Sequence, residues 1–164
     1  GADIILIPEI PYDIDKVVEA IEHRTREGKG FTILAVAEGA ISKEDAKLSK
    51  KELKEKMKNS KYPSVSYELA DRIKEKTGTE IRITVPGHTQ RGGSPCPYDR
   101  VLSTRMGAAA AQMILKEDYG YMVAIVNGKI KKVPLEEAAG KLKMVSPDDQ
   151  IIKEAKLIGI SFGD

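Results

Sequence analysis

Two short apolar runs, separated by one amphipathic segment, constrain the fold of this chain more than any other feature. The runs are Ile4–Ile7 and Phe31–Ala37, and apart from one threonine they are entirely apolar. Runs of this kind are typical of strands that are covered on both faces of a sheet. Between them, a good N-cap, Asp13, precedes apolar residues at helical spacing: Ile14, Val17, Val18 and Ile21. Strand, helix and strand in this order predict a βαβ unit with parallel strands.

Later segments extend this pattern. Spaced apolar residues in Val65–Gly78 predict a second amphipathic helix. In Glu80–Val85 apolar and polar residues alternate, which predicts a third strand with Arg82 held rigidly on its polar face. A long helix follows from about Tyr98 to Lys116, and its apolar face carries Leu102, Met106, Ala109 and Met113.

The last third of the chain predicts a hairpin and two short helices. Asn127 and Gly128 form a strong two-residue turn between the expected strands Tyr121–Val126 and Lys129–Val133, and the helices are expected at Leu135–Ala139 and Asp148–Leu157. Residues 1–164 are therefore expected to form a three-layer α/β/α Rossmann-like lobe with a mainly parallel sheet. A first strand this apolar normally has neighbours on both sides, so we expect a preceding part of the protein to supply one.

The lysine-rich stretch Gly39–Ser64 differs from its surroundings. Ser49 and Glu52 resemble a capping box, and Leu53 and Met57 are the only strong apolar pair that follows. Acidic residues are interleaved with the lysines, which favours a solvated surface helix over an anion-binding one. We interpret residues 39–64 as a surface insertion.

Composition excludes several classes of function. The chain has 27 basic and 25 acidic residues, a net charge of +2 that argues against dedicated nucleic-acid binding. No apolar run approaches the length of a membrane span, so neither nucleic acid nor a membrane is an expected partner. The single cysteine, Cys96, fits a reducing compartment, and we expect a cytoplasmic protein.

The segment Val85–Arg100 carries the clearest functional signal. Glycines, prolines, His88 and Arg91 are concentrated between the expected third strand and the long helix. Glycines let a backbone approach a ligand, a helix start offers N–H groups, and guanidinium forks bind phosphate or carboxylate. An ordinary tight loop is the alternative. The pattern favours a site for a phosphorylated or carboxylated small molecule.

Ligands of open α/β sheets bind beyond the carboxyl ends of the strands. That rule selects Glu38, which follows the second apolar run directly and could accept hydrogen bonds from sugar hydroxyls; a helix cap or a salt bridge is the alternative. One cysteine and two distant histidines argue against a zinc site, and the sequence shows no catalytic group. The residues thus indicate binding without indicating a reaction.

The sequence GHTQRGGSPCPYDR, from Gly87 to Arg100, together with Val101–Gly107, closely resembles the sugar-phosphate segment of the 6-phosphofructokinases. Gly1–Glu9 and Phe31–Glu38 also match that family in order and spacing. The resemblance covers nearly the whole chain apart from the 39–64 stretch, and it is to the C-terminal half of such an enzyme. It implies a phosphotransferase of glycolysis that converts fructose 6-phosphate to fructose 1,6-bisphosphate.

The resemblance also implies roles for single residues. Glu38 would bind sugar hydroxyls, His88 and Arg91 would hold the 6-phosphate, and Arg82 would reach the sugar phosphate of a neighbouring subunit in a homotetramer. The catalytic base, the nucleotide site and most contacts to Mg²⁺ and ATP would lie in the N-terminal half. The isolated chain is therefore expected to be inactive. A pyrophosphate donor, or a non-catalytic sugar-phosphate-binding or assembly domain, are the alternative interpretations.

The family's effector site is only partly matched. Asp3 and Lys29 stand where the family has an acidic and a basic residue of that site, but Glu27 and Phe31 replace a lysine and a histidine. We interpret Asp3 and Lys29 as a remnant of an effector site, without effector control of the usual kind.

Overall fold

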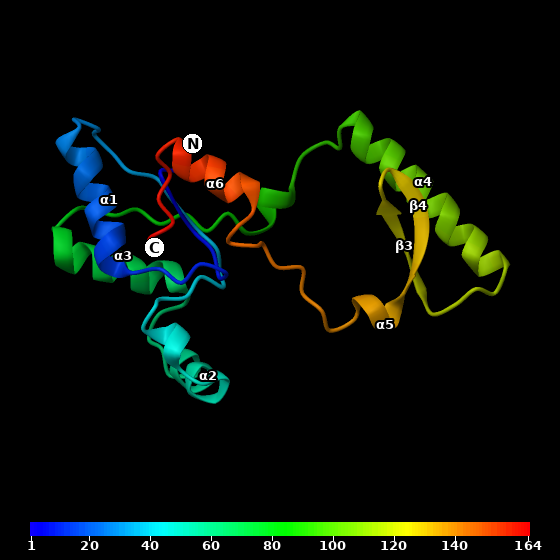
Figure 1. Ribbon diagram of the computed structural model, residues 1–164, viewed down its shortest axis with the longest axis horizontal. Coiled ribbons are helices and arrows are strands. Elements are labelled where there is room, and N and C mark those ends of the chain that lie inside the picture. The colour runs from blue at the N-terminus through cyan, green and yellow to red at the C-terminus, as the bar shows by residue number, and fades with distance from the viewer. The chain divides into compact units, whose positions relative to one another are not determined.

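The computed structural model describes residues 1–164 and divides into two compact units (Figure 1). The first unit comprises Gly1–Thr84 and Met144–Asp164, and the second comprises Val85–Lys143. None of the helices combines the length and the apolar character that crossing a membrane requires.

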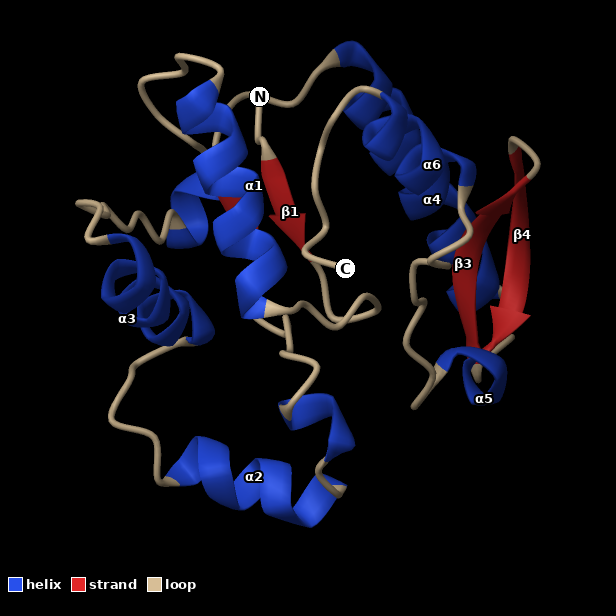
Figure 2. Cartoon of the chain, turned by 60° about the vertical axis from the view of Figure 1, so that its left-hand side comes forward, coloured by secondary structure: helices blue, strands red, loops and turns tan.

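The first unit is built around the expected βαβ motif. β1 (Ile4–Leu6) and β2 (Leu34–Val36) pair in parallel, and α1 (Ile14–Arg26) connects them (Figure 2). The other edge of β1 pairs with Ser161, whose carbonyl accepts from the Ile5 N–H at 2.9 Å. β1 is therefore central, as predicted, but its second neighbour comes from later in the chain and not from a preceding part.

Side chains of β1 enter two apolar clusters, one on each face of the sheet. Ile4 and Leu6 are fully buried against α1 and α3 (Val65–Thr77) in a cluster with Val17, Ile21, Leu69 and Ile73. Ile5 and Ile7 pack on the other side with α6 (Gln150–Leu157) and Phe162. Helices thus cover both faces of a parallel sheet, which confirms the α/β/α arrangement.

Two details of the predicted sheet are wrong. Residues 80–85, which follow α3, form no strand. The second apolar run is a strand only at Leu34–Val36, with Phe31 71% and Ile33 47% exposed. Because no strand pairs with the outer edge of β2, Phe31 and Ile33 before it are not covered.

The 39–64 stretch folds as a short 3₁₀ helix, η1 (Asp45–Lys47), followed by α2 (Lys50–Lys58). The predicted capping box is present, because Glu52 Oε2 accepts from the Ser49 N–H at 2.8 Å and Ser49 Oγ accepts from the Glu52 N–H at 3.3 Å. No residue of α2 is buried, which confirms a solvated helix.

The second unit contains the 3₁₀ helix η2 (Gly87–Arg91), α4 (Pro97–Leu115), the antiparallel strands β3 (Tyr121–Val126) and β4 (Lys129–Pro134), and α5 (Leu135–Ala138). Asn127 and Gly128 both have positive φ, 52° and 75°, as the predicted hairpin turn requires. The half-buried residues of α4 include all four of its predicted apolar face: Leu102, Met106, Ala109 and Met113.

Candidate functional site

His88 and Arg91 lie on η2, three residues apart. A 3₁₀ helix has three residues per turn, so side chains at this spacing project from the same side. The turn is held by Thr89, whose hydroxyl donates to the Pro86 carbonyl, and by the Gly92 N–H, which donates to the Thr89 carbonyl at 3.1 Å. Both His88 and Arg91 are exposed and neither side chain has a hydrogen-bond or ion-pair partner in the protein. The two side chains are therefore available to one anion.

The start of α4 contributes less to anion binding than the sequence suggested. Asp99 Oδ2 accepts the Cys96 N–H at 3.0 Å. Hydrogen bonding to the Cys96 side chain, and secondly to this N–H, lowers the pKa of the Asp99 carboxyl. A carboxylate thus already occupies the first turn of α4, which the helix dipole favours. The donors that η2 leaves available for an anion are the His88 and Arg91 side chains.

Glu38 stands just past the end of β2. The Ala37 N–H donates to the Leu6 carbonyl at 2.9 Å, and the Ala40 N–H closes a turn onto the Ala37 carbonyl at 3.0 Å. These bonds hold the backbone on both sides of Glu38, whose side chain is exposed and makes no hydrogen bond or ion pair. The predicted position at a strand tip is confirmed, and the carboxylate can accept hydrogen bonds from the hydroxyl groups of a ligand.

Arg82 is placed differently from the prediction. Ile81 and Ile83 line a shallow groove on α3 beside Tyr67 and Ala70, so Arg82 between them does project to the opposite side. However, no sheet supports this segment, and the Arg82 side chain is 89% exposed. Its one partner is Glu80, with Nε 3.2 Å from Oε1. The expectation of a rigid strand position is wrong, because the pairing that would fix it is absent.

The structure brings His88 and Arg91 together on one turn of the second unit, whereas Glu38 and Arg82 belong to the first unit. The four predicted residues share one property: each side chain is exposed. None of them contributes to either apolar cluster. This is the condition expected of binding residues, as opposed to residues that stabilise the fold.

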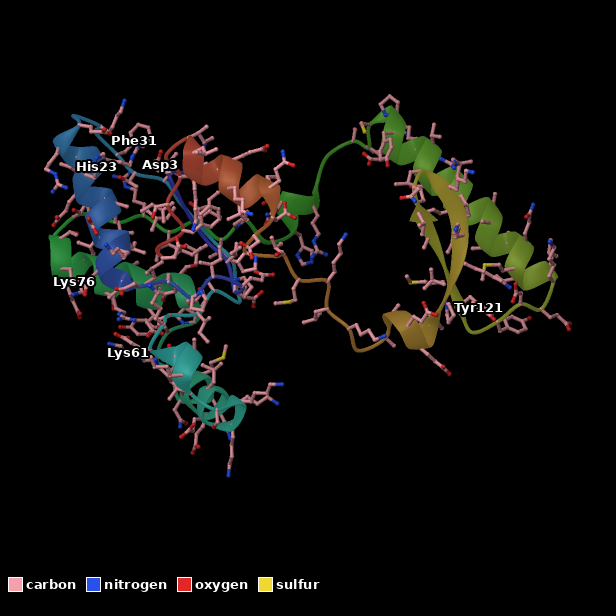
Figure 3. The ribbon with its side chains drawn as sticks, in the orientation of Figure 1. Asp3, His23, Phe31, Lys61, Lys76 and Tyr121 are labelled. Atoms are coloured by element: carbon pink, nitrogen blue, oxygen red, sulfur yellow. The ribbon has the colours of Figure 1, made fainter.

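Asp3 is fully engaged within the protein. Asp3 is labelled in Figure 3. Its Oδ1 lies 3.0 Å from Arg24 Nη1, and its Oδ2 accepts the Ile33 N–H at 2.8 Å. Arg24 also donates to the Phe31 carbonyl at 3.4 Å. Lys29 is exposed, and its side chain has no partner. The Asp3 carboxylate therefore joins the start of β1 to α1 and to the segment before β2.

Sequence reasoning missed Arg24 and its role. A signal was present, because Val17, Ile21 and Arg24 follow one another at helical spacing on the face of α1 that packs inward. A charged residue on the same helix face as buried residues needs an oppositely charged partner, and the Asp3 carboxylate is that partner. The Cys96–Asp99 cap was equally readable, since an acid three residues after an N-cap position is a helix-start signal.

The fold and the predicted residues together define a class: a chain with an α/β/α lobe built on a parallel sheet, followed by a 3₁₀ turn on which the His88 and Arg91 side chains have no protein partner. The family model for phosphofructokinase matches residues 1–114. The chain belongs to the phosphofructokinase family.

Curated relatives agree with this assignment over the whole chain. An ATP-dependent 6-phosphofructokinase of Spirochaeta thermophila is 50% identical over 164 residues, which is 100% of this chain and 45% of that protein. A second, from Chloroflexus aurantiacus, is 42% identical over 164 residues and is covered to 44%. The chain thus spans less than half the length of these relatives.

Solved structures show the same fold. A pyrophosphate-dependent phosphofructokinase of Marinobacter aquaeolei aligns with a TM-score of 0.67 at 21% identity, over 98% of this chain and 41% of that one. The phosphofructokinase of Saccharomyces cerevisiae aligns with a TM-score of 0.59 at 28% identity, over 84% of this chain and 17% of that one.

Proposed function

We propose that this chain is the sugar-phosphate-binding lobe of an ATP-dependent 6-phosphofructokinase of the cytoplasm. The whole enzyme transfers a phosphoryl group from ATP to the 1-hydroxyl of fructose 6-phosphate in glycolysis. One observation carries the proposal: His88 and Arg91, free of protein partners, project from one side of η2 within the segment that resembles the family's sugar-phosphate motif. The ATP-dependent relatives support ATP over pyrophosphate as donor.

The residues of this chain hold and orient the acceptor. Arg91 offers two parallel N–H groups to the 6-phosphate, and His88 adds a third donor. Glu38 accepts hydrogen bonds from sugar hydroxyls, which fixes the direction of the sugar. Arg82 reaches the 6-phosphate bound by a neighbouring subunit of a homotetramer. Fixing the 1-hydroxyl against the donor lowers the entropic part of the barrier, and this positioning acts together with charge stabilisation in phosphoryl transfer.

The reactive groups belong to the rest of the enzyme. No group of three or more His, Cys, Asp or Glu side chains in this chain is placed to hold a metal ion. The catalytic base, ATP and Mg²⁺ are assigned to the N-terminal half, and the isolated chain is inactive. Asp3 and Lys29 are a remnant of an effector site, because the Asp3 carboxylate is already bound to Arg24 and to the Ile33 N–H.

Replacement of Arg91 tests the proposal. Arg91→Ala in the full-length enzyme removes a charged hydrogen-bonding group, which contributes about 1.5–3 kcal/mol, so the Michaelis constant for fructose 6-phosphate rises by about ten- to 150-fold. The measurement is steady-state kinetics in a coupled assay for fructose 1,6-bisphosphate. Lys116→Ala removes one positive charge at the far end of α4 and serves as the control.

An unchanged Michaelis constant in Arg91→Ala, or an equal rise in Lys116→Ala, would contradict the assignment.

The same assay tests Arg82. An inactive Arg82→Ala enzyme should regain activity when its subunits are mixed with those of a variant that lacks only the catalytic base, because one kind of site in the mixed tetramer is then complete.

A further inference from the structure

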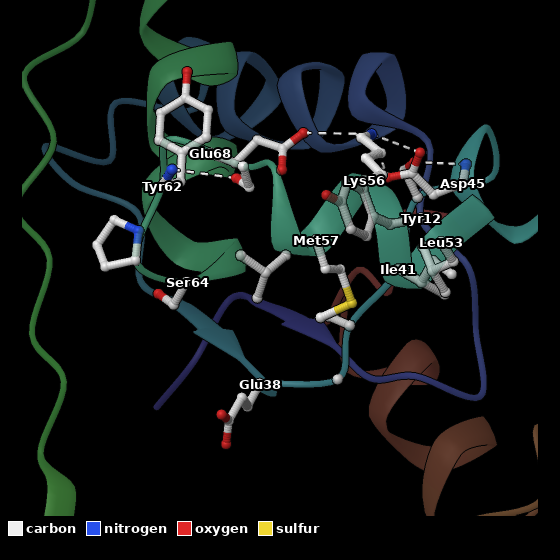
Figure 4. Close-up of a pocket in the computed structure, with 16 residues that line it drawn as sticks. Tyr12, Glu38, Ile41, Asp45, Leu53, Lys56, Met57, Tyr62, Ser64 and Glu68 are labelled. Atoms are coloured by element: carbon white, nitrogen blue, oxygen red, sulfur yellow. Dashed lines mark hydrogen bonds and ion pairs between the residues drawn. The ribbon is translucent and has the colours of Figure 1, made fainter. Parts of the chain in front are cut away.

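The positively charged side chains of this chain are directed in two different ways. In the pocket under α2 a partner directs the cation, because Lys56 Nζ lies 2.7 and 2.8 Å from the two Asp45 carboxylate oxygens, an interaction that Figure 4 marks with dashed lines. His88 and Arg91 have no such partner. The direction in which these two side chains project is therefore set by the backbone of η2.

The backbone of η2 is not held by a core. No residue of η2 is buried. A glycine with positive φ is its first residue, and another lies just beyond its end: Gly87 at 55° and Gly93 at 116°. Glycine has more backbone freedom than any other residue, so the chain can change direction on both sides of the turn at little steric cost. Hydrogen bonds within the turn are then what fixes its conformation.

Thr89 is the residue at which these hydrogen bonds meet. Its N–H donates to the Pro86 carbonyl at 3.2 Å, and its hydroxyl donates to the same carbonyl. Its own carbonyl accepts the Gly92 N–H at 3.1 Å. The hydroxyl bond is the only side-chain hydrogen bond made by a residue of η2. Short hydroxyl side chains readily bond to nearby backbone carbonyls in this way. Thr89 thus ties the residue before the turn to the residue after it.

From these contacts we propose that Thr89 is a positioning residue, whose hydroxyl holds η2 in the conformation that presents His88 and Arg91 to one phosphate group. A 3₁₀ helix has three residues per turn, so position 89 lies about 120° around the axis from positions 88 and 91. Thr89 therefore acts through its two neighbours and not by contact with the phosphate. The inference rests on the proposed function of the His88–Arg91 pair.

Thr89→Val in the full-length enzyme tests the proposal, because valine keeps the branched shape and removes the hydroxyl. The Michaelis constant for fructose 6-phosphate should rise about fivefold, the effect of losing one neutral hydrogen bond, while kcat changes less than about twofold. A loss of folded enzyme would instead lower the apparent kcat and leave the Michaelis constant unchanged. Thr89→Ser keeps the hydroxyl and should restore a Michaelis constant close to that of the wild type.

Thr104→Val is the matched control. Thr104 Oγ1 also donates to a backbone carbonyl, that of Arg100 at 2.9 Å, but Thr104 lies within α4 and outside the turn. Loss of this hydroxyl should leave the Michaelis constant unchanged.

A double substitution tests whether Thr89 acts through Arg91. In an Arg91→Ala background, Thr89→Val should raise the Michaelis constant further by less than about twofold, because the main group that the hydroxyl directs is then absent. Amide hydrogen exchange of Gly92 in the ligand-free enzyme reports on the turn itself. It should be faster in Thr89→Val than in the wild type or in Thr104→Val.

Four results would overturn the proposal: a Michaelis constant that Thr89→Val leaves unaltered, an equal rise in Thr104→Val, a full fivefold rise in the Arg91→Ala background, and Gly92 exchange that Thr89→Val does not change. Arg91→Ala alone separates this inference from the proposed function. If Arg91→Ala raises the Michaelis constant and Thr89→Val does not, only the role of Thr89 is wrong. If neither substitution raises it, the proposed function fails and the role of Thr89 fails with it.

Discussion

The two units of this chain differ in how their residues are buried, although both consist of well-formed helices and strands. Every buried residue belongs to the first unit, where β1 is covered on both faces. In the second unit the corresponding aliphatic residues are exposed, among them Ile114 at 63%, Leu115 at 84% and Leu142 at 85%. The comparison shows that local signals are sufficient to set helices and a hairpin, while a core requires pairing between distant segments.

The second unit is held by contacts that are individually weak. The half-buried face of α4 packs on the hairpin, and Arg105 Nη2 donates to the Gly128 carbonyl at 3.1 Å. Lys132 Nζ lies 2.6 Å from Asp118 Oδ2 and 4.4 Å from the centre of the Tyr121 ring. Exposed ion pairs contribute about 0–1 kcal/mol each. The turn with His88 and Arg91 is thus part of the less consolidated unit, whereas Glu38 is anchored beside the core.

The largest expected effect comes from truncating the core of the first unit. Leu6 is fully buried, and Leu6→Ala should lower the free energy of opening of β1 by about 2–5 kcal/mol, the range for buried leucines. Leu102→Ala is the matched change in the second unit, and it should cost α4 less than half as much because Leu102 is only half-buried. Native-state hydrogen exchange of the full-length protein measures both.

Equal losses of opening free energy in Leu6→Ala and Leu102→Ala would contradict the difference in burial between the two units. Such a result would mean that α4 is covered in the full-length protein as completely as β1 is covered here.

A second substitution tests how tightly the core of the first unit is closed. Gly163 has a φ of +71°, and an added Cβ would lie 3.0 Å from Tyr12 Cβ, 3.0 Å from Val17 Cγ2 and 3.2 Å from Leu6 Cδ2. Gly163→Ala therefore combines overpacking, about 1–3 kcal/mol, with an unfavourable backbone conformation of about 1–2 kcal/mol.

The control for Gly163 is Gly159→Ala, in the same unit. Gly159 has a φ of +86° but open space around its Cβ position, so only the backbone cost applies. The difference between the two thermal midpoints isolates the packing contribution. Two equal midpoints would show that the C-terminal segment shifts to accommodate the added methyl group without a packing cost.

The sequence predicted those features that depend on neighbouring residues. The Ser49–Glu52 capping box, the Asn127–Gly128 turn and the stripe of Leu102 and Met106 on α4 are all confirmed, because each signal and its structural consequence lie within a few residues of each other. Among the site residues, the strand-tip position of Glu38 follows from the same kind of signal.

The features that depend on distant partners were not predictable in the same way. The alternation of Ile81, Arg82 and Ile83 shows which side is apolar but not whether another strand is available, and here none pairs with it. Likewise, nothing near Ile5 in the sequence indicates that its N–H bonds to Ser161 at the other end of the chain. The Asp3–Arg24 pair also joins separate elements, although the position of Arg24 on the inward face of α1 indicated that it needs a partner.

The smallest expected effect concerns the helix caps, where the two units are alike. Asp99 accepts the Cys96 N–H in the second unit as Glu52 accepts the Ser49 N–H in the first. The pKa of each carboxyl is lowered, mainly by hydrogen bonding to the side chain of its cap residue and secondly by this backbone bond. A lowered pKa means that each cap contributes at pH values above the usual pKa of its carboxyl, 3.8 for Asp99 and 4.5 for Glu52, and that its contribution is lost as the pH falls through the lowered value. The amide-proton signal of Cys96 should therefore move only below pH 3.8, and that of Ser49 only below pH 4.5.

Substitution separates the two caps from general acid unfolding. Asp99→Ala should abolish the acid transition of the Cys96 amide and speed its exchange at neutral pH, while the Ser49 amide keeps its own transition. The cap acts only on the first turn of its helix. Asp99→Ala should therefore speed amide exchange at the start of α4 as much as Glu52→Ala speeds it at the start of α2, despite the difference in burial between the units. A much larger increase for Asp99→Ala would show that the start of α4, which has no buried residues, depends on this one hydrogen bond.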